Sequence, residues 1–572
     1  MASGSGVIPT CRLRGMANQY ITSAALLFAA FRLAVVALLG VLLWRHRQTL
    51  TPRQLVAGLV AVNTLACVLY LAPLKRPYSL APGLDRAFAM GMAANVVAGN
   101  SAWDHVQVGQ AAPEPLWNWT FAALSGFNID RIPRAFDGVA VASAALLPLL
   151  IFLGLGLAEG ATPWSVAFVT LSTVQLSSIS LGERAPTLPF WLANIQHKPN
   201  HGLGFVLIAI LLGLLCRREP RVVPLALGLS ALGWVFLMHW GWFLPAMVIL
   251  AVWKRDDWRP FRTIAVALVI SAAAILPFVL NLMRDYAPGV QDPAARHLWD
   301  DVRGRSLSIP VWTLLDPAPL VLLALAGIRA ARRRDSWLDR GLTALVISAW
   351  ATWGVSSIGS WFGFAPEPDD LHYFLRFATA AMAGLGLEDL ARELGRHAGL
   401  EPVDAFARAA IILLPFTFVA QWYPPIADRY YPVSIEPMNR KVTDYAAYIR
   451  ENTTVRDVFD GGEEPSTFIP ALTGRRVLKA PTALIPHDQE ARSRVEETLM
   501  TGADPGLIRE AARRYGVTFL VLDEEMVRRY APDIAVDVTA RQRESTGAFR
   551  IVYRSNLVHI LAITAGPLSP QS

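Results

Sequence analysis

Residues 81–105, APGLDRAFAMGMAANVVAGNSAWDH, open the longest polar gap in the first half of a mostly apolar chain. A turn at 81–83 precedes Asp85, and the apolar side chains that follow recur at the spacing of one helix face. Gly99 and Asn100 are residues that typically end a helix, and Asp104 follows them. Two acids on either side of an amphipathic helix predict either an active-site loop at a membrane surface or a plain interfacial loop with solvated charges.

The composition is typical of a membrane protein with one soluble part. Of the 572 residues, 53% are apolar and 17% are charged, and the mean hydropathy is +0.37. We find no zinc-finger or RNA-binding motif and no concentrated basic run. We therefore attribute the net charge of +7 to arginines that anchor membrane loops, not to nucleic-acid binding. Cys11, Cys67 and Cys216 are far apart, which indicates neither a disulfide framework nor a metal–thiolate site.

Long apolar segments predict a polytopic α-helical membrane domain over residues 18–421, after a short N-terminal tail at 1–17. A helix needs about 20 apolar residues to cross the bilayer core, and by this criterion we expect about twelve spans. Two of them, 202–216 and 240–253, are short and could be tilted, broken or re-entrant. The expected spans are 18–44, 54–74, 137–157, 163–181, 202–216, 222–238, 240–253, 263–283, 311–328, 341–361, 372–390 and 407–421.

Basic residues are concentrated in every second loop of this arrangement. Examples are Arg217-Arg218, Lys254-Arg255 and Arg332-Arg333-Arg334. The positive-inside rule places these loops in the cytoplasm, so the loop 75–136 and the chain after residue 421 are expected outside. The sequence thus predicts a multi-pass protein of the plasma (inner) membrane with an extracytoplasmic C-terminal domain.

The composition changes after Gln421, and residues 422–572 are predicted to form a soluble α/β domain. We find no phosphate-binding loop, dinucleotide fingerprint or nucleophile elbow there. We therefore expect the chemistry to lie elsewhere, and the cavity of the acidic loop to form without residues 436–572. The helical patterns are 440–451, 488–500 and 505–515, and the strand-like runs are Val455–Phe459, Arg476–Leu478, Thr518–Leu522, Phe549–Tyr553 and His559–Ile563.

The segment 182–201 carries groups that could bind an anion. His197, Lys198 and His201 could contact phosphate oxygens, Lys198 as a point charge and the histidines through ring N–H groups. His197 and His201 could instead bind a metal if the segment were helical, which Pro199 opposes. A plain capping loop is the third alternative.

The segment 366–376 is expected to begin another span. Asp370 is a good helix cap, and His372 and Arg376 share one face of the helix that follows it. Arg376 would then lie about one turn into the membrane, where it needs an anionic partner such as a lipid phosphate.

These features together resemble the GT-C superfamily of integral-membrane glycosyltransferases, and most closely the branch of the protein O-mannosyltransferases and the bacterial aminoarabinose transferase. In that branch an acid opens the first large outer loop, an amphipathic helix ends at a glycine, a proline-rich re-entry follows, and an arginine begins the next span. This chain has the same order in Asp85, Gly99, Pro113-Glu114-Pro115-Leu116-Trp117 and Arg134. It departs at Arg86, which stands where the branch often has a second acid.

The resemblance covers most of the chain. Glu183-Arg184 resembles the polar end of the family's next helix pair, and the segments 444–452 and 514–517 are similar to the outer domain of many bacterial members. One apolar span precedes the family's usual first one, and the lysine before the re-entry proline is absent.

The resemblance implies an inverting transferase of the bacterial cell envelope, which moves a sugar from a polyprenyl-phosphate carrier to a glycan, lipid or protein acceptor at the outer face of the membrane. A carboxylate would take the acceptor's proton, and cations would bind the leaving phosphate. A divalent cation, Mg or Mn, would bind Asp85 and Asp104 if one is used. The candidate residues are Asp85, Asp104 and Glu183 for catalysis, and Arg184, His197, Lys198, His201 and Arg376 for phosphate binding.

The alternative is a non-enzymatic transporter or assembly factor for lipid-linked glycans. Many transporters show an internal repeat and carry acids inside their spans. We find no repeat between the two halves of this chain, and the expected spans hold few charged residues, Arg32 and Asp316 among them. The sequence therefore favours the enzyme.

Overall fold

The structure is a computed structural model that describes part of the chain. The expected first span at 18–44 lies almost wholly outside this part, and so does most of the segment 182–201. The described residues are 41, 45, 50–71, 84–112, 115–175, 199–254, 258–286, 318–334, 336–361, 368–421, 435–480 and 486–564.

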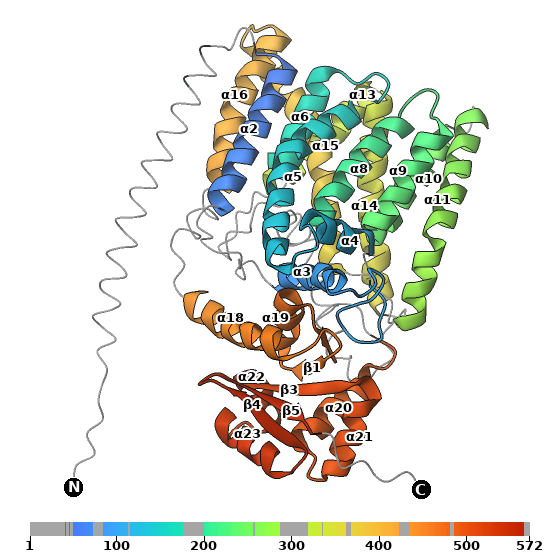
Figure 1. Ribbon diagram of the computed structural model, residues 1–572. Helices are drawn as coiled ribbons and strands as arrows, with labels where there is room; N and C mark the ends of the chain where they lie inside the picture. Colours follow the sequence, from blue (N-terminus) through green and yellow to red (C-terminus); the bar gives the residue numbers. More distant parts are fainter. Residues whose placement is uncertain are drawn as a thin grey trace.

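Most of the described chain is a bundle of long helices that stands on a smaller unit built around a β-sheet (Figure 1). The predicted spans that fall on described residues are helical, and the span 222–238 is interrupted at Phe236, between α9 and α10. The bundle helices are α2 (Pro52–Leu71), α5 (Ile132–Leu155), α6 (Pro163–Gln175), α8 (Pro199–Leu215), α9 (Val222–Val235), α10 (Leu237–Trp253), α11 (Trp258–Asp285), α13 (Ala318–Arg334), α14 (Trp337–Trp361), α15 (Pro368–His397) and α16 (Pro402–Gln421).

Several of these helices are apolar on all sides, as expected of helices that face lipid. On α5, Leu147 and Ile151 are buried while Leu149 and Leu153 are exposed. Within the described residues, the segments 129–155, 258–285 and 337–359 are helical, long and apolar enough to cross a membrane, and five further apolar helices are shorter. The protein is therefore a mostly helical membrane protein, and the number of its spans stays a prediction.

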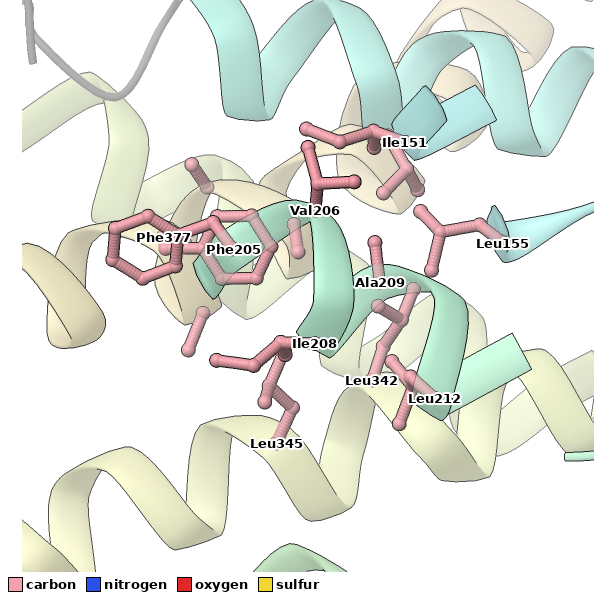
Figure 2. Packing of buried hydrophobic residues seen from close by; sticks show 14 of the residues in the cluster. Ile151, Leu155, Phe205, Val206, Ile208, Ala209, Leu212, Leu342, Leu345 and Phe377 are labelled. Carbon is pink, nitrogen blue, oxygen red and sulfur yellow. The ribbon is translucent and has the colours of Figure 1, made fainter. Parts of the chain in front are cut away.

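The helices pack through apolar side chains in the centre of the bundle (Figure 2). Phe205 of α8 stacks on Phe377 of α15 with 4.7 Å between ring centroids. Ile151 of α5 belongs to the same cluster of buried residues. Close helix approach requires small residues: a Cβ on Gly213 of α8 would lie 1.9 Å from the backbone oxygen of Gly154 of α5.

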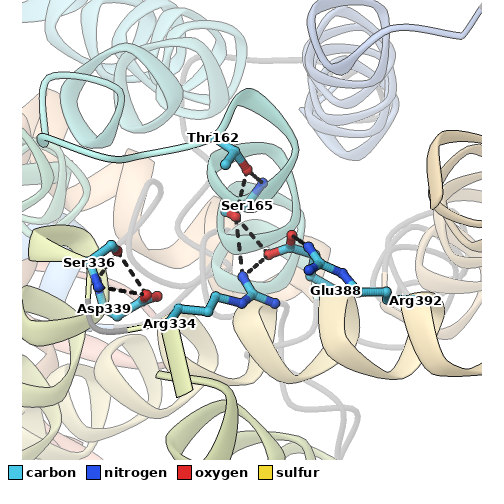
Figure 3. A network of polar contacts seen from close by, with 7 residues as sticks. All are labelled: Thr162, Ser165, Arg334, Ser336, Asp339, Glu388 and Arg392. Carbon is cyan, nitrogen blue, oxygen red and sulfur yellow. Dashed lines mark hydrogen bonds and ion pairs between the residues drawn. The ribbon is translucent and has the colours of Figure 1, made fainter. Parts of the chain in front are cut away.

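Polar side chains form a network around one buried carboxylate at the end of the bundle away from the sheet (Figure 3). The Glu388 carboxylate accepts hydrogen bonds from the Ser165 hydroxyl at 2.7 Å and from Arg392 at 2.9 Å, and it also pairs with Arg334. Glu388 itself is buried. The charge of the Glu388 carboxylate is thus compensated by Arg334 and Arg392 within the protein.

The sheet has five strands in the order β2-β1-β3-β5-β4, and each of the five predicted strands overlaps one of them. β1, β2 and β3 are parallel, whereas β5 is antiparallel to both β3 and β4. We call residues 435–564 the α/β unit. Its elements are α18 (Ile435–Asn452), β1 (Val458–Gly461), α19 (Glu463–Thr473), β2 (Arg476–Val477), α20 (Gln489–Thr501), α21 (Pro505–Tyr515), β3 (Val517–Asp523), α22 (Glu524–Tyr530), α23 (Val536–Ser545), β4 (Phe549–Arg554) and β5 (Val558–Ile563).

The acidic loop lies between the bundle and the α/β unit (Figure 1). Its predicted amphipathic helix is confirmed as α3 (Leu84–Val97), which is followed by α4 (Pro115–Leu124) and a short 3-10 helix η1 (Ile129–Arg131). Gly99 has a φ of +92°, a conformation that favours glycine at a helix end. α3 packs on α19, where a Cβ on Gly91 would lie 3.0 Å from the Pro470 side chain.

The loop also extends the sheet. The Val477 N–H donates to the Val106 backbone oxygen at 2.9 Å, and the Val108 N–H donates to the Val477 oxygen at 3.0 Å, so residues 106–108 pair with β2 as a further parallel edge. Trp117 and Phe121 of α4 share one apolar core with Tyr445 of α18. The loop and the α/β unit are therefore one packed body.

Candidate functional site

A cavity of about 240 Å³ lies where the acidic loop, the end of α11 and β2 meet. We call it the loop pocket. Asp104, one of the two acids singled out from the sequence, contributes to its wall. The lining residues are Trp103, Asp104, His105, Gly109, Gln110, Ala111, Asn281, Arg284, Asp285 and Arg476.

Local hydrogen bonds fix the position of Asp104. The Asn95 side-chain amide, on α3, donates to the Asp104 backbone oxygen at 3.0 Å. The Asp104 carboxylate is exposed and accepts a bond from the Ser101 backbone N–H at 3.2 Å. Its backbone is thus anchored while its carboxylate stays accessible to a ligand.

His105 turns into the protein beside Asp104. Its Nδ1 accepts a hydrogen bond from the Gln107 N–H at 2.9 Å, which assigns the ring proton of the neutral imidazole to Nε2. Burial, reinforced by the positive charge of Arg492, lowers the pKa of His105 from 6.5 to about 3. At neutral pH His105 is therefore an uncharged hydrogen-bond donor.

Arg492 of α20 locks the loop to the α/β unit. Its guanidinium donates to the Val108 oxygen and to the Leu478 oxygen, both at 2.7 Å, and to the Asp488 carboxylate at 2.8 Å. The side chain is 1% exposed, so these bonds replace its water shell completely. On the other side of the loop, the Tyr286 hydroxyl donates to the Ala111 oxygen at 2.6 Å.

A second polar group lies among the N-terminal ends of α8, α10 and α15. The His201 ring centroid is 5.0 Å from that of His239 and 5.7 Å from that of Tyr373. Arg376 follows Tyr373 by one turn on α15, and His201, His239 and Arg376 are buried. We call these four residues the histidine group. Helix N-termini carry partial positive charge, so the three N-terminal ends, one of them on the helix that carries Arg376, favour an anion.

The junction of α9 and α10 links the two sites. The Phe236 ring lies 4.2 Å from that of His201, and the Trp234 ring lies 5.5 Å from that of Trp103, centroid to centroid. The loop pocket and the histidine group therefore flank the same short segment, at the end of the bundle that carries the α/β unit.

Of the residues predicted from the sequence, Asp104 lines the loop pocket, and His201 and Arg376 belong to the histidine group. Asp85 is placed by its backbone in the first turn of α3, one turn before Phe88, whose ring lies 5.1 Å from that of His105. Convergence of all the candidates on one cavity stays a prediction. Glu183, Arg184, His197 and Lys198 lie outside the described residues.

The expectation that the cavity forms without residues 436–572 stays a prediction. In the full chain, Arg476 of β2 lines the loop pocket, and Arg492 of α20 bonds to the Val108 oxygen of its loop, so the α/β unit contributes to this cavity. The sequence carries no local signal for these two roles, because both arginines lie hundreds of residues from the loop.

A metal site is not apparent in the described part of the chain, where no three His, Cys, Asp or Glu side chains cluster. The carboxylate of Asp85 is not among the described side chains. The pairing of Asp85 with Asp104 around a cation therefore stays a prediction.

No family model and no curated protein sequence matches this chain. Solved structures, in contrast, do match this chain. The oligosaccharyltransferase of Archaeoglobus fulgidus, in a complex with Zn and sulfate, matches 82% of this chain and 69% of its own, with 15% identity and a TM-score of 0.52. The mycobacterial arabinofuranosyltransferase AftD matches 90% of this chain and 40% of its own, with 16% identity and a TM-score of 0.54.

ArnT of Cupriavidus metallidurans also matches, over 89% of this chain and 98% of its own, with 14% identity and a TM-score of 0.48. We base the fold assignment on the oligosaccharyltransferase and AftD, whose TM-scores exceed 0.5. The resemblance found in the sequence is confirmed at the level of the fold, and the chain has the fold of the GT-C integral-membrane glycosyltransferases.

Proposed function

We propose that this protein is a glycosyltransferase that moves a sugar from a polyprenyl-phosphate carrier to an acceptor at the outer face of the membrane. The observation that carries the proposal is the placement of an accessible carboxylate, Asp104, at the same end of the bundle as the cationic histidine group. Glycosyl transfer from a lipid phosphate needs both functions, a base for the acceptor and cations for the leaving group.

The acidic loop and the histidine group have separate roles in the proposed reaction. A carboxylate, Asp85 or Asp104, takes the proton of the acceptor hydroxyl as its oxygen forms a bond to the anomeric carbon. The bond between that carbon and the phosphate oxygen breaks, and the phosphate leaves with the electron pair. Arg376 and the helix N-termini around His201 stabilise the charge that develops on the phosphate. Glu183, Arg184, His197 and Lys198 remain candidates for the same roles.

Asp85→Asn and Asp104→Asn test the proposal. Asn keeps the size and capping ability of Asp but takes up no proton. We expect each protein to fold normally, and at least one to lose transfer of a radiolabelled polyprenyl-phosphate sugar by about 10²–10⁴-fold. Asp130→Asn is the matched control, because Asp130 is an exposed acid of the same loop that pairs with Arg450, and transfer should stay near wild type.

Wild-type transfer by both well-folded variants would overturn the assignment of the base and favour the transporter or assembly factor. A divalent cation, Mg or Mn, bound by Asp85 and Asp104 is proposed as well. Loss of transfer in EDTA, restored by either ion, supports it, and unchanged transfer in EDTA contradicts it.

The proposal places the acidic loop and the α/β unit on the outer face of the plasma membrane. Cysteines introduced at Ser101 and Ser545 should both react with an impermeant maleimide in intact cells. Labelling of only one of them would contradict the structure, in which loop and unit are one packed body.

A further inference from the structure

The loop pocket carries balanced charge. Arg284 and Asp285 already pair, with 2.8 Å between Nε and Oδ1. Arg476 adds one positive charge and Asp104 one negative charge. A site lined by one sign of charge attracts the opposite sign, whereas a balanced site gives an ion no electrostatic advantage. The charges therefore favour a neutral ligand.

Three lining side chains have a buried polar atom with no hydrogen-bond partner among the residues that the structure describes. These atoms are Nε of Arg476, Nε2 of His105 and Oε1 of Gln110. His105 is 1% exposed and Gln110 is 8% exposed. More than about 90% of buried polar groups in proteins are bonded, so a cluster of such atoms around one cavity indicates a ligand that completes them.

The unpaired atoms include both hydrogen-bond donors and an acceptor. Arg476 Nε–H and His105 Nε2–H are donors, the latter because Nδ1 accepts from Gln107. Gln110 Oε1 is an acceptor, since the Gln110 amide N–H is directed to Asp488 at 3.3 Å. A hydroxyl group donates and accepts at once, so several hydroxyls on one small molecule match this mixture.

The part of the pocket wall formed by Trp103 offers an apolar surface on which a sugar ring can pack. Trp103 is 38% exposed, and its ring is supported by edge contacts with Trp234 and Phe278 at centroid distances of 5.5 and 6.3 Å. An exposed indole offers an apolar surface to the C–H face of a ring. The volume of about 240 Å³ is below the ~300–1,000 Å³ of pockets for drug-sized ligands, which favours a single ring.

We propose that the loop pocket binds one neutral sugar ring of the acceptor, and that the α/β unit supplies Arg476 to this site. The inference rests on the proposed function and narrows its acceptor from a glycan, lipid or protein to a glycan. It also gives the α/β unit a direct part in substrate recognition.

Saturation-transfer-difference NMR on the full-length protein in detergent tests the site without any donor. The probes are D-glucose, D-galactose, D-mannose and D-arabinose, with inorganic phosphate as the anionic probe. We expect signals from at least one sugar, and Asn281→Leu or Arg476→Met should weaken its binding about tenfold or more, because each removes a polar group that lines the pocket while keeping side-chain bulk.

Arg554→Met is the matched control. Arg554 lies on β4, at the opposite edge of the same sheet, and is exposed, so sugar signals should be unchanged. No signal from any of the sugars, or signals that persist in both pocket variants, would overturn the proposal. The proposal would also be overturned if inorganic phosphate binds, both pocket variants abolish that binding, and no sugar binds.

The outcomes also separate this site from the proposed function. Sugar binding lost in Asn281→Leu and Arg476→Met, in a protein that never transfers, would support the pocket and overturn the transferase. Transfer that is unaffected by both variants would support the transferase and overturn the pocket.

Discussion

The two ends of the helical bundle differ in whether the buried polar group at their centre has hydrogen-bond partners. At the end away from the sheet, the buried Glu388 carboxylate is bonded to Ser165, Arg334 and Arg392 (Figure 3). At the end beside the sheet, His105 and Gln110 keep buried polar atoms without a partner in the described part of the chain. We call the Glu388 end the closed end because the carboxylate itself has its partners, although Nη2 of Arg334 and Nε of Arg392 have none among the described residues. A paired carboxylate contributes to the stability of the fold. Unpaired buried polar groups, as at the end beside the sheet, which we call the open end, cost free energy and are expected where a ligand completes them.

The largest effect is expected at the closed end. Glu388→Ala leaves two arginines facing each other without their carboxylate, and breaking such a buried pair costs about 3–5 kcal/mol. Denaturant unfolding in detergent measures the loss. Transfer per folded molecule should be unchanged, because the network lies at the far end of the bundle.

Glu393→Ala is the matched control for Glu388. It removes an exposed pair with Arg396 on the same helix, which should cost less than about 1 kcal/mol. Equal losses in the two variants would show that the Glu388 network is not closed against water.

A somewhat smaller effect is expected where the loop meets the α/β unit. Arg492→Met removes the bonds to the Val108 and Leu478 oxygens while keeping the side-chain stem, with a cost on the order of 3 kcal/mol. The loop should also become sensitive to limited proteolysis within residues 101–112. Arg494→Met is the control, since Arg494 is an exposed neighbour on α20. Wild-type protease resistance of Arg492→Met would contradict the locking role.

The helical architecture could be predicted because it depends on local patterns. The apolar runs predicted the bundle helices, and the strand-like runs that alternate with helical patterns predicted the five strands. The helix α19 was not predicted, although it packs on α3 and carries Pro470 within it. An interior proline lowers helix propensity, and only tertiary packing compensates for it.

The candidate site could be predicted only where its residues are close in sequence. Asp85, Asp104 and the helix between them follow from one stretch of chain. Arg476 and Arg492 reach the loop only because residues 106–108 pair with β2, and that pairing joins segments more than 300 residues apart. No periodicity in the sequence reports such a contact.

The smallest of the three stability effects is a pH dependence at the open end. The pKa of His105 is about 3 in the folded protein and 6.5 for an exposed histidine. Below about pH 6.5 the unfolded chain takes up a proton that the folded protein takes up only near pH 3, so stability falls as the pH falls. Between pH 7.5 and 5.0 the loss from His105 is about 2 kcal/mol.

His105→Asn tests this effect, because the Asn oxygen can still accept from Gln107 but the side chain does not titrate. The thermal midpoint of wild type should fall more between pH 7.5 and 5.0 than that of His105→Asn. His487→Asn, at an exposed histidine, should behave as wild type. Equal pH dependence in all three proteins would mean that His105 is hydrated or paired in solution. The open end would then resemble the closed one, and the argument for a ligand at His105 would fail.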